Sequence, residues 1–510
     1  MPGTQRSEPK PCVLVVFGAS GDLTRRKVMP ALCGLACEKL LPERTVVLGF
    51  ARTEMSDEQF RARIKEGVEQ FSRHAPCGDA WERLAGRTFY QRGDYSQRAD
   101  FEALRGRVEE LDRQFGVGGS RTFHFAVVPD LTPVILGNLA ACGLIEQRHP
   151  AQETEKGYIR VVLEKPFGRD VESARALNTS LEEKLDESQV FRIDHYLGKE
   201  TVQNIIVLRF ANSIFEPVWN SRHVKHVHVT VAETTGIEGR AGFFERTGAL
   251  RDVMQNHVLQ LLSLVMMEPP SSLSPDSIRE EKAKVLRSLR PLSGGDLECS
   301  VVRGQYGRGE IDGQAVPGYR EEEGVDPRSS METFVAMRTY IDNWRWAGVP
   351  LYLATGKRLA AHLTEIAVEF KEVPNVLFQT LENVDLETNL LKIRVQPDEG
   401  VSLRISTKAP GLDMEVRPAE MDFPYGSVFG SASPEAYERL LLDVMSGNAT
   451  LFARRDEIEL AWQFVDPILC HWERQSAPAF PNYPAGTWGP IRGADFFRED
   501  TCYSRVPPRM

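Results

Sequence analysis

The chain has 510 residues, a net charge of −10 and 26% charged residues, which suggests two or three domains with extensive apolar cores. The negative net charge excludes a protein-wide basic surface of the kind that binds nucleic acid. A phosphorylated ligand would therefore need a local basic pocket. The longest apolar stretch, Val258–Met267, contains polar residues and is too short to span a bilayer.

The eight cysteines are scattered and form no CxxC pair. Cys33 and Cys37 lie four residues apart without His partners nearby, so a core or neutral role is favoured over zinc binding. Reduced thiols fit the cytosol. The polar, proline-containing N-terminus indicates a short disordered leader and not a signal peptide. We therefore expect a cytoplasmic protein.

The first two hundred residues alternate strand and helix patterns. Apolar runs predict buried parallel strands, and Ser56-Asp57-Glu58-Gln59 predicts a capping box that opens one of the helices. The expected strands are 12–17, 45–50, 121–127, 158–164 and 190–194, and the expected helices include one ending near residue 40, one over 100–115 and one over 170–187. Repeated strand–helix units predict a Rossmann-like, doubly wound parallel sheet in a domain over residues 1–200.

The pattern changes after about residue 215. Alternation with period two predicts mainly antiparallel strands over 224–231, 391–395 and 401–406. Helical patterns occupy 248–267, 277–290 and 434–446. We expect residues 201–510 to form an α+β domain with a large, mainly antiparallel sheet. Two stretches rich in Gly, Pro, Glu or Ala are predicted to be a long surface loop over 303–330 and an irregular segment over 475–489.

The segment Gly18–Leu23 follows the first buried strand and opens a helix. In a dinucleotide site, glycines at this place let the backbone approach the pyrophosphate, and helix amides meet its charge. The spacing is GxxG and not GxGxxG, and ordinary strand–helix turns also use glycine. The position after strand one favours a nucleotide site. Arg25, Arg26 and Lys27 add positive charge at the helix start, which a bound anion would offset.

Arg52 lies just beyond the second predicted strand, and no Asp or Glu occurs between Val46 and Thr53. NAD sites usually place an acid here for the ribose hydroxyl, whereas an Arg accommodates the extra phosphate of NADP. The sequence therefore favours NADP, with use of both coenzymes left open. A solvated loop Arg is the alternative interpretation.

The nonapeptide from Arg192 to Glu200, RIDHYLGKE, lies where a predicted strand ends and a predicted helix begins. In open α/β sheets ligands bind at such places, beside helix N-terminal amides that favour anions. His195 and Lys199 are predicted to share one face of a forming helical turn and to grip a phosphate. Asp194 would repel a phosphate and is better suited to orienting and charging an imidazole.

Glu164-Lys165-Pro166-Phe167-Gly168 ends another predicted strand. The proline restricts Lys165 to extended geometry and permits a cis bond. A lysine fixed there would face the ligand crevice and donate to substrate oxygens. The alternative is a simple helix start, where proline is common.

Arg251-Asp252-Val253-Met254-Gln255-Asn256-His257 interrupts an otherwise apolar helix with polar side chains. Oxidation of an alcohol needs a general base with a pKa near neutrality, and His257 is of the usual type. Glu233 ends an alternating strand and Lys357 follows another, so both are candidate sugar or phosphate contacts, although each alone is also typical of a surface charge. His223, His226 and His228 have metal-like spacing, but no further ligand completes a site and a structural role is favoured. We expect no metal.

In this order, the segments GASGDL, EKPFG, RIDHYLGKE, RFAN and RDVMQNH closely resemble the glucose-6-phosphate dehydrogenase family, from Gly18 to about Trp472. The resemblance implies that the coenzyme is bound by Gly18, Ser20, Gly21, Asp22, Leu23, Arg52 and Lys165. It implies a phosphate grip at His195, Tyr196 and Lys199, and sugar contacts at Lys165, Glu233, Asp252 and Lys357. It implies His257 as the general base, held by Asp194.

The activity that the resemblance implies is oxidation of D-glucose 6-phosphate to 6-phospho-D-glucono-1,5-lactone with reduction of NADP to NADPH, the first step of the oxidative pentose phosphate pathway. The family is usually dimeric or tetrameric through its large sheet, so we expect a homo-oligomer without nucleic acid or membrane partners. Two alternatives stay open: an NAD-tolerant dehydrogenase of another sugar phosphate, in which a lysine does the acid–base work, and a catalytically silent NADP-binding protein.

Overall fold

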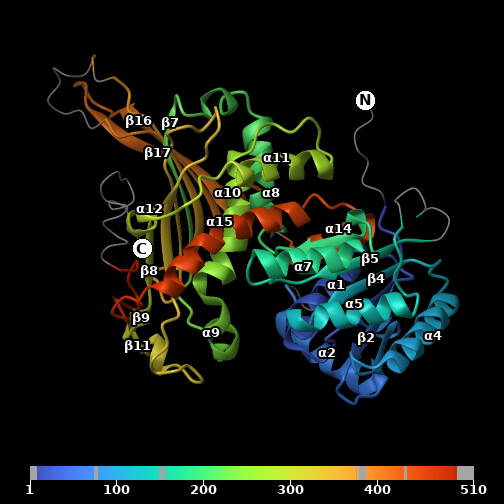
Figure 1. Ribbon diagram of the computed structural model, residues 1–510. Coiled ribbons are helices and arrows are strands. Elements are labelled where there is room, and N and C mark those ends of the chain that lie inside the picture. The colour runs from blue at the N-terminus through green and yellow to red at the C-terminus, as the bar shows by residue number, and fades with distance from the viewer. Residues whose placement is uncertain are drawn as a thin grey trace. The chain divides into compact units, whose positions relative to one another are not determined.

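The computed structural model describes residues 8–73, 79–148, 153, 157–374, 376–377, 386–429 and 434–490. The chain forms two compact units, and Figure 1 shows their elements. The first unit contains Met1–Glu200, Pro270–Glu280 and Pro434–Glu459, and the second contains the remaining three segments. Two segments distant in sequence thus join the first unit, and a division of the chain at residue 200 leaves them out.

A seven-stranded sheet forms the core of the first unit. Its strands are β1 (Val13–Phe17), β2 (Val46–Ala51), β3 (Thr88–Arg92), β4 (Arg121–Phe125), β5 (Ile159–Leu163), β6 (Val190–Ile193) and β18 (Phe452–Ala453). They lie in the order β18-β6-β5-β4-β1-β2-β3, and all neighbours are parallel except β18 and β6. All residues of β1, β2 and β5 are buried, because helices cover both faces. The predicted doubly wound parallel sheet is confirmed.

The helices of the first unit form two packed groups (Figure 1). They are η1 (Thr24–Val28), α1 (Met29–Cys37), α2 (Asp57–Phe71), α3 (Ala80–Ala85), α4 (Arg98–Phe115), η2 (Pro129–Leu131), α5 (Thr132–Ala141), α7 (Val171–Glu182), η4 (Glu187–Gln189) and α14 (Ala436–Ser446). Helix α1 packs against α2, α3 and α14, and α5 packs against α4 and α7. The predicted capping box opens α2: the Gln59 N–H donates to Ser56 Oγ at 3.2 Å, and the Ser56 N–H donates to Gln59 Oε1 at 2.9 Å.

An eight-stranded sheet forms the core of the second unit, in the order β17-β16-β15-β14-β7-β13-β12-β8. Its strands are β7 (Val224–Ala232), β8 (Val301–Gly304), β12 (Phe334–Thr339), β13 (Leu351–Gly356), β14 (Leu363–Phe370), β15 (Leu390–Gln396), β16 (Gly400–Lys408) and β17 (Val416–Pro424). All neighbours are antiparallel except β7 and β13, which are parallel. The predicted large, mainly antiparallel sheet is confirmed.

The remaining helices are α8 (Glu200–Phe210), η5 (Glu216–Val218), α9 (Ala241–Ala249), η6 (Leu250–Val258), α10 (Leu259–Met266), α11 (Pro275–Arg287), α12 (Gly295–Ser300), η7 (Tyr319–Glu321), α13 (Tyr425–Phe429) and α15 (Arg455–Arg474). Helices α11 and α15 contribute residues to both units. Helix η6 packs on β7, β12 and β13. None of the described helices has the length and hydrophobicity needed to cross a membrane.

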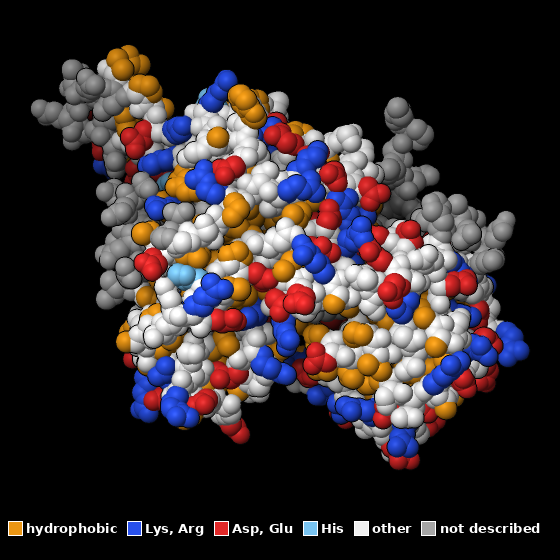
Figure 2. Space-filling view, viewed as in Figure 1, with side chains coloured by type: hydrophobic (Ala, Val, Ile, Leu, Met, Phe, Trp, Pro, Cys, Tyr) orange, Lys and Arg blue, Asp and Glu red, His pale blue; other side chains and the backbone are white. Residues whose placement is uncertain are grey.

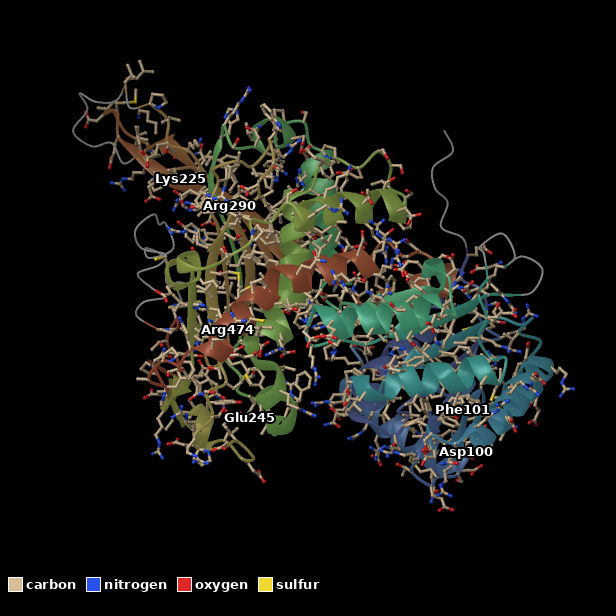
Figure 3. All side chains as sticks on the ribbon, viewed as in Figure 1. Asp100, Phe101, Lys225, Glu245, Arg290 and Arg474 are labelled. Atoms are coloured by element: carbon tan, nitrogen blue, oxygen red, sulfur yellow. The ribbon has the colours of Figure 1, made fainter. Side chains whose placement is uncertain are left out.

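The prediction of a long surface loop over 303–330 is wrong. This stretch contains the strands β9 (Tyr306–Gly307), β10 (Gly309–Ile311) and β11 (Gln314–Val316) and the short helix η7. The side chains of Tyr306 and Tyr319 are fully buried. The Tyr319 hydroxyl donates to Glu245 of α9, which Figure 3 labels. The glycines serve close packing here, since a Cβ at Gly309 would lie 2.1 Å from the carbonyl oxygen of Ala485.

The predicted irregular stretch 475–489 is irregular except for the two-residue strand β19 (Tyr483–Pro484), which pairs with β9. The short pairing fits Pro481 and Pro484, which flank Asn482 and Tyr483, because proline cannot donate to a strand ladder.

His226 and His228 share one face of β7, as the alternation predicts, and their ring centres lie 4.7 Å apart. His228 stacks on Tyr352 of β13. His226 Nε2 lies 3.0 Å from a carboxylate oxygen of Glu369 on β14. Thr388 donates to that carboxylate at 2.9 Å. Burial raises the pKa of Glu369, but its contacts with His226, Thr388 and Lys225 together outweigh burial and lower this pKa to about 2.

We expect Glu369→Gln to reduce the loss of unfolding free energy that occurs as the pH falls. A carboxyl whose pKa falls from 4.5 to about 2 on folding stabilises the protein above pH 4.5, and this contribution is lost as the pH falls toward 2. Chemical denaturation in steps from neutral pH down to about pH 3 should show a steeper loss of unfolding free energy for the wild type than for Glu369→Gln. Glu372→Gln is the control, because that side chain is 74% exposed beside the same Lys225. Parallel curves for the wild type and Glu369→Gln would contradict the assignment.

Candidate active site

The candidate site residues of the first unit all follow the carboxyl ends of parallel strands. The segment Gly18–Leu23 follows β1, Arg52 follows β2, Lys165 follows β5, and Asp194–Lys199 follow β6. Because these strands run in one direction, their carboxyl ends lie at one edge of the sheet. The strand order 3-2-1-4-5-6 reverses between β1 and β4, and open α/β sheets bind ligands outside such a reversal point.

Gly18 lies at this reversal point and cannot be replaced without strain. Its φ is +81°, and a Cβ would lie 2.0 Å from the carbonyl oxygen of Ala126, which follows β4. The Gly18 N–H donates to the Tyr95 hydroxyl at 3.0 Å. The Gly21 N–H donates to the Gly18 carbonyl at 2.8 Å. The turn therefore presents bare backbone where the helix begins, which fits a pyrophosphate.

Arg52 is held beside the same turn. Its guanidinium lies 5.9 Å from the ring centre of Tyr95, and its side chain is exposed. The loops after β1 and β2 are joined where the Thr53 hydroxyl donates to Ser20 Oγ at 3.1 Å, and Arg63 of α2 donates to the Ser20 carbonyl at 2.9 Å. An exposed arginine at the end of the second strand suits the extra phosphate of NADP. The residues present therefore fit this coenzyme.

The three cations of the helix start have protein partners. Arg25 donates to Gln70 at 3.2 Å, Arg26 pairs with Asp22 at 3.3 Å, and Lys27 lies 3.7 Å from Glu435. These pairs are partly exposed, so each is worth about 1 kcal/mol or less. Asp22, expected to contact the coenzyme, is thus also the partner of Arg26.

The turn after β6 differs from the prediction that His195 and Lys199 share one face of a forming helical turn. Residues 194–199 form hydrogen-bonded turns, and α8 begins only at Glu200. The cause is Asp194: its Oδ1 accepts the Tyr196 N–H at 2.9 Å and its carbonyl accepts the Leu197 N–H at 3.1 Å. An Asp side chain that bonds two residues onward favours a turn over a helix.

Tyr196 nevertheless keeps the two expected phosphate ligands close together. Its ring is buried. The ring centre lies 4.8 Å from Lys199 Nζ and 5.0 Å from the ring centre of His195. An ammonium over an aromatic face is electrostatically favourable. The cluster thus retains an imidazole and an ammonium around one phenol.

Lys165 is half-buried two residues after the end of β5. The Lys165–Pro166 peptide is cis, as the sequence permits. The lysine lies at the same sheet edge as the glycine turn and the turn after β6.

In the second unit, Glu233 and Lys357 follow β7 and β13 directly. These strands are parallel, with Ala232 opposite Gly356, so the two side chains leave the sheet at the same edge. Lys357 Nζ donates to Glu233 Oε2 at 2.5 Å. Lys357 is 3% exposed, whereas Glu233 is half-buried. The pair retains two ammonium N–H donors and a carboxylate oxygen that suit sugar hydroxyls.

Asp252 and His257 lie on η6, which is π-helical and packs on β7 and β13. The predicted helix over 248–267 is therefore three pieces, α9, η6 and α10, with a kink at Gly248. His257 is 2% exposed and Asp252 is half-buried. The expected burial of the His257 region is confirmed, and the π-helical turns are of a kind frequent at functional sites.

Glu332 holds the start of η6. It is buried, its carboxylate accepts the Leu250 N–H at 3.1 Å, and its carbonyl accepts the Ala249 N–H at 3.1 Å. Burial raises the pKa of Glu332. The carboxylate lies against Gly248, where a Cβ would be 2.2 Å from Glu332 Oε1. Neither Glu332 nor Tyr95 belongs to a motif, so no pattern in the sequence predicts these two supporting residues.

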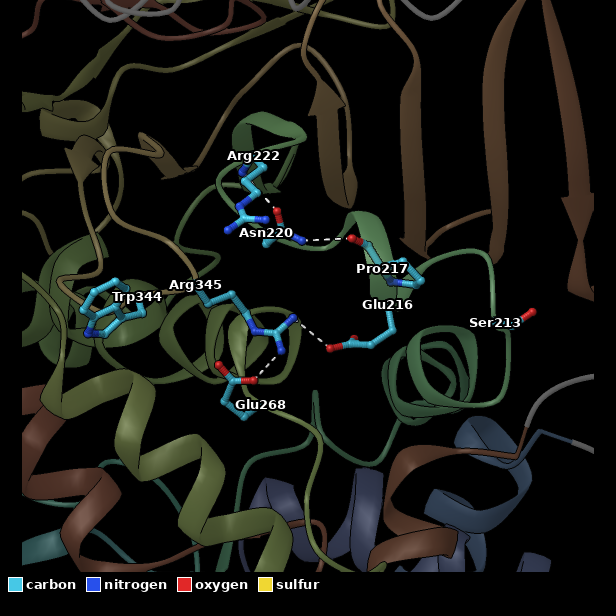
Figure 4. A pocket seen from close by; sticks show the side chains of 8 residues that line it. All are labelled: Ser213, Glu216, Pro217, Asn220, Arg222, Glu268, Trp344 and Arg345. Atoms are coloured by element: carbon cyan, nitrogen blue, oxygen red, sulfur yellow. Dashed lines mark hydrogen bonds and ion pairs between the residues drawn. The ribbon is translucent and has the colours of Figure 1, made fainter.

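A pocket of about 790 Å³ in the second unit shares no residue with these clusters (Figure 4). Its lining includes Arg345, which pairs with Glu216 at 2.7 Å and also with Glu268. The guanidinium is therefore already neutralised by two carboxylates. We place the candidate site at the strand ends and not in this pocket.

We expect Gly248→Ala to destabilise the protein strongly. Gly248 has φ +62° and ψ −179°, a region open essentially to glycine and costing other residues about 1–3 kcal/mol. The clash with Glu332 adds to this. Urea denaturation should show a lower midpoint, and activity should fall more than the loss of folded protein explains, because η6 begins there. Gly242→Ala is the matched control, since a Cβ there meets nothing within 4 Å. Equal midpoints for both variants would contradict the strain.

The family model for the NAD binding domain of glucose-6-phosphate dehydrogenase matches residues 15–204, and the model for the C-terminal domain of that enzyme matches residues 206–504. The chain is 48% identical over 482 residues to a glucose-6-phosphate 1-dehydrogenase of Chlamydia pneumoniae, covering 94% of this chain and 93% of the relative. It is 42% identical to one of Rhizobium meliloti, covering 96% and 97%. A solved glucose-6-phosphate dehydrogenase in complex with glucose 6-phosphate superposes with a TM-score of 0.88 at 34% identity, covering 98% and 100%. The chain belongs to the glucose-6-phosphate dehydrogenase family.

Proposed function

We propose that this protein oxidises D-glucose 6-phosphate to 6-phospho-D-glucono-1,5-lactone and reduces NADP to NADPH, the first step of the oxidative pentose phosphate pathway. The observation that carries the proposal is the single sheet edge shared by the glycine turn after β1, Lys165 after β5 and the turn after β6. This edge combines a dinucleotide turn with a compact cationic cluster. The family relationship supports the same activity.

The coenzyme would be held by Gly18, Ser20, Gly21, Asp22, Leu23, Arg52 and Lys165. When bound, NADP supplies the nicotinamide that accepts the hydride from the anomeric carbon. The bare backbone at Gly18 and the helix amides beyond it meet the pyrophosphate charge. Arg52, exposed at the end of β2, recognises the extra phosphate.

The sugar phosphate would be held through its phosphate by His195, Tyr196 and Lys199. Asp194 supports this grip, because its hydrogen bond to the Tyr196 N–H shapes the turn. Binding energy gained at the phosphate, which does not react, orients the anomeric carbon. Lys165, Glu233, Asp252 and Lys357 contact the sugar. The 2.5 Å hydrogen bond from Lys357 Nζ to Glu233 Oε2 holds the ammonium and the carboxylate in place before the sugar binds.

His257 would be the general base that takes the proton of the anomeric hydroxyl as the hydride leaves. A buried imidazole on a packed helix keeps one orientation, which general base catalysis requires. Asp194 stabilises the imidazolium that forms.

We expect the purified protein to reduce NADP in the presence of glucose 6-phosphate, as measured by the absorbance of the reduced nicotinamide. Parallel reactions contain NAD in place of NADP, or unphosphorylated glucose. Reduction should need the phosphate and prefer NADP. His257→Asn should lower kcat by about 10²–10⁴-fold, and more than Lys165→Ala does.

Three outcomes of this assay contradict parts of the proposal. Equal rates with both coenzymes would remove the role given to Arg52. A larger loss in Lys165→Ala than in His257→Asn would make lysine the acid–base group. No reduction with either coenzyme, from folded protein, would exclude the dehydrogenase and favour a silent NADP-binding protein.

We also propose a cytoplasmic homo-oligomer, either a dimer or a tetramer. The cytoplasm is supported by the free thiols of Cys12, Cys142, Cys299 and Cys470 among the described residues. Self-association is supported by the apolar face of β16 and β17, at one end of the eight-stranded sheet (Figure 1, Figure 2). Met421 and Phe423 of β17 are 53% and 42% exposed, opposite Leu403 and Val401. Such an exposed apolar strand at a sheet edge is typical of an interaction site.

We expect the double variant Met421→Asp with Phe423→Asp to lower the molar mass measured by light scattering. Two charges on an interface that buries these side chains would be desolvated without partners. Leu273→Asp is the control, because that exposed leucine lies in the other unit. An unchanged mass in the double variant, or a monomeric wild type, would contradict this surface as the interface.

A further inference from the structure

The carboxylate of Glu164 is held from two sides at the end of β5. Glu164 lies between Leu163, the last residue of β5, and Lys165. Its Oε1 is 2.9 Å from Nε2 of His124 on β4, the strand beside β5. Its Oε2 accepts the Tyr437 hydroxyl of α14 at 3.0 Å. The side chains of His124 and Glu164 are 0% and 10% exposed, so little solvent screens either contact.

The hydroxyl of Tyr437 remains a donor to this carboxylate. Burial, followed by the charge of Glu164, raises the pKa of Tyr437 well above its ordinary value. A protonated phenol whose oxygen lies beside a carboxylate donates its proton to that carboxylate.

Helix α14 also supports the turn after β6. A Cβ on Gly198 would lie 2.8 Å from the carbonyl oxygen of Ala436. Gly198 belongs to the turn that carries His195 and Lys199, and Ala436 precedes Tyr437. One helix start therefore contacts both the chain before Lys165 and the turn that would grip the phosphate.

The buried Glu164 carboxylate joins β4, β5 and α14, but burying it lowers the stability of the fold. Its desolvation costs several kcal/mol unless hydrogen bonds compensate, and apolar side chains of similar size often stabilise a fold as well or better. What the carboxylate adds is direction, since two hydrogen bonds at fixed angles hold the Glu164 backbone and hence the origin of the Lys165 side chain.

We infer that Glu164 is a positioning residue for Lys165, with His124 and Tyr437 as its two supports. The inference rests on the proposed function, in which Lys165 contacts the substrate beside the coenzyme. A displacement of about 1 Å at a positioned group can cost about 10²-fold in rate. Loss of the Glu164 carboxylate would therefore lower the reaction rate by displacing the Lys165 ammonium.

The test is a double-mutant cycle between Glu164→Ala and Lys165→Ala, measured as kcat/KM and as the dissociation constant for glucose 6-phosphate by calorimetry. We expect Glu164→Ala to lower kcat/KM by roughly 10²-fold in the native background and by less than about threefold when Lys165 is already alanine, because coupled residues are non-additive. Equal losses in both backgrounds would overturn the inference and leave Glu164 a structural residue.

The Glu164→Gln variant tests whether the hydrogen bonds of Glu164 or its negative charge accounts for its effect on activity. The amide oxygen can accept from Tyr437 while the amide N–H₂ donates to His124 in its other tautomer. We expect it to recover most of the activity lost in Glu164→Ala, and Tyr437→Phe, which loses one of the two supports, to give an intermediate loss. No recovery with glutamine in folded protein would overturn positioning through hydrogen bonds.

Asp112→Ala is the matched control in the same unit. The Asp112 carboxylate of α4 also accepts two hydrogen bonds, from the Gly118 N–H at 2.9 Å and the Gly119 N–H at 3.0 Å, in the loop before the amino end of β4 and so away from the site edge. We expect it to lower the unfolding midpoint with kcat/KM changed less than about twofold. If it lowers kcat/KM as much as Glu164→Ala, general destabilisation explains both and the inference fails. Wild-type activity, measured first, separates this failure from failure of the proposed function.

Discussion

Parallel pairing of strands is the constraint on which the candidate site depends. Parallel neighbours end at the same edge of a sheet, so residues far apart in sequence are gathered if each follows a strand. In the first unit, this places the turn after β1, Lys165 and the turn after β6 at one edge. The second unit uses the same device once within its described sheet: β7 and β13 run parallel and bring Glu233 to Lys357. The antiparallel pairs of that sheet would have sent such residues to opposite ends.

The sequence predicts those parts of this arrangement whose residues are buried in a recognisable pattern. Five strands of the first sheet were predicted, because strands covered on both faces are nearly continuous apolar runs. The edge strand β3, Thr88–Arg92, was missed, since its burial alternates and it has no such run. Strand β18 was missed for another reason. It has two residues and joins β6 from more than 250 residues later in the chain, and no local pattern can encode that partner.

The prediction of the candidate site has the same limit, because no local pattern identifies the distant residues that support it. Residues that would touch ligands lie in short motifs, whereas the groups that hold them come from distant parts of the chain. Tyr95 is 77 residues from Gly18, Glu332 is 82 from Leu250, and Tyr437 is 273 from Glu164. Glycine was misinterpreted where composition was the only guide. In the stretch 303–330 glycine permits close packing around buried tyrosines and does not mark the long surface loop that was predicted.

Buried carboxylates recur at the ends of the elements that carry this site. Burying each carboxylate lowers stability, which indicates that it serves to orient the element. Glu332 meets the first N–H of η6, and Glu164 receives two hydrogen bonds at the end of β5. Burial raises the pKa of Glu332, so the charged form of this carboxyl is destabilised by folding. An apolar side chain would avoid this loss but would leave the end of its element free to shift. Hydrogen bonds fix direction, whereas apolar contacts fix only distance. The fold therefore accepts lower stability where a helix or strand must present its side chains in a single orientation.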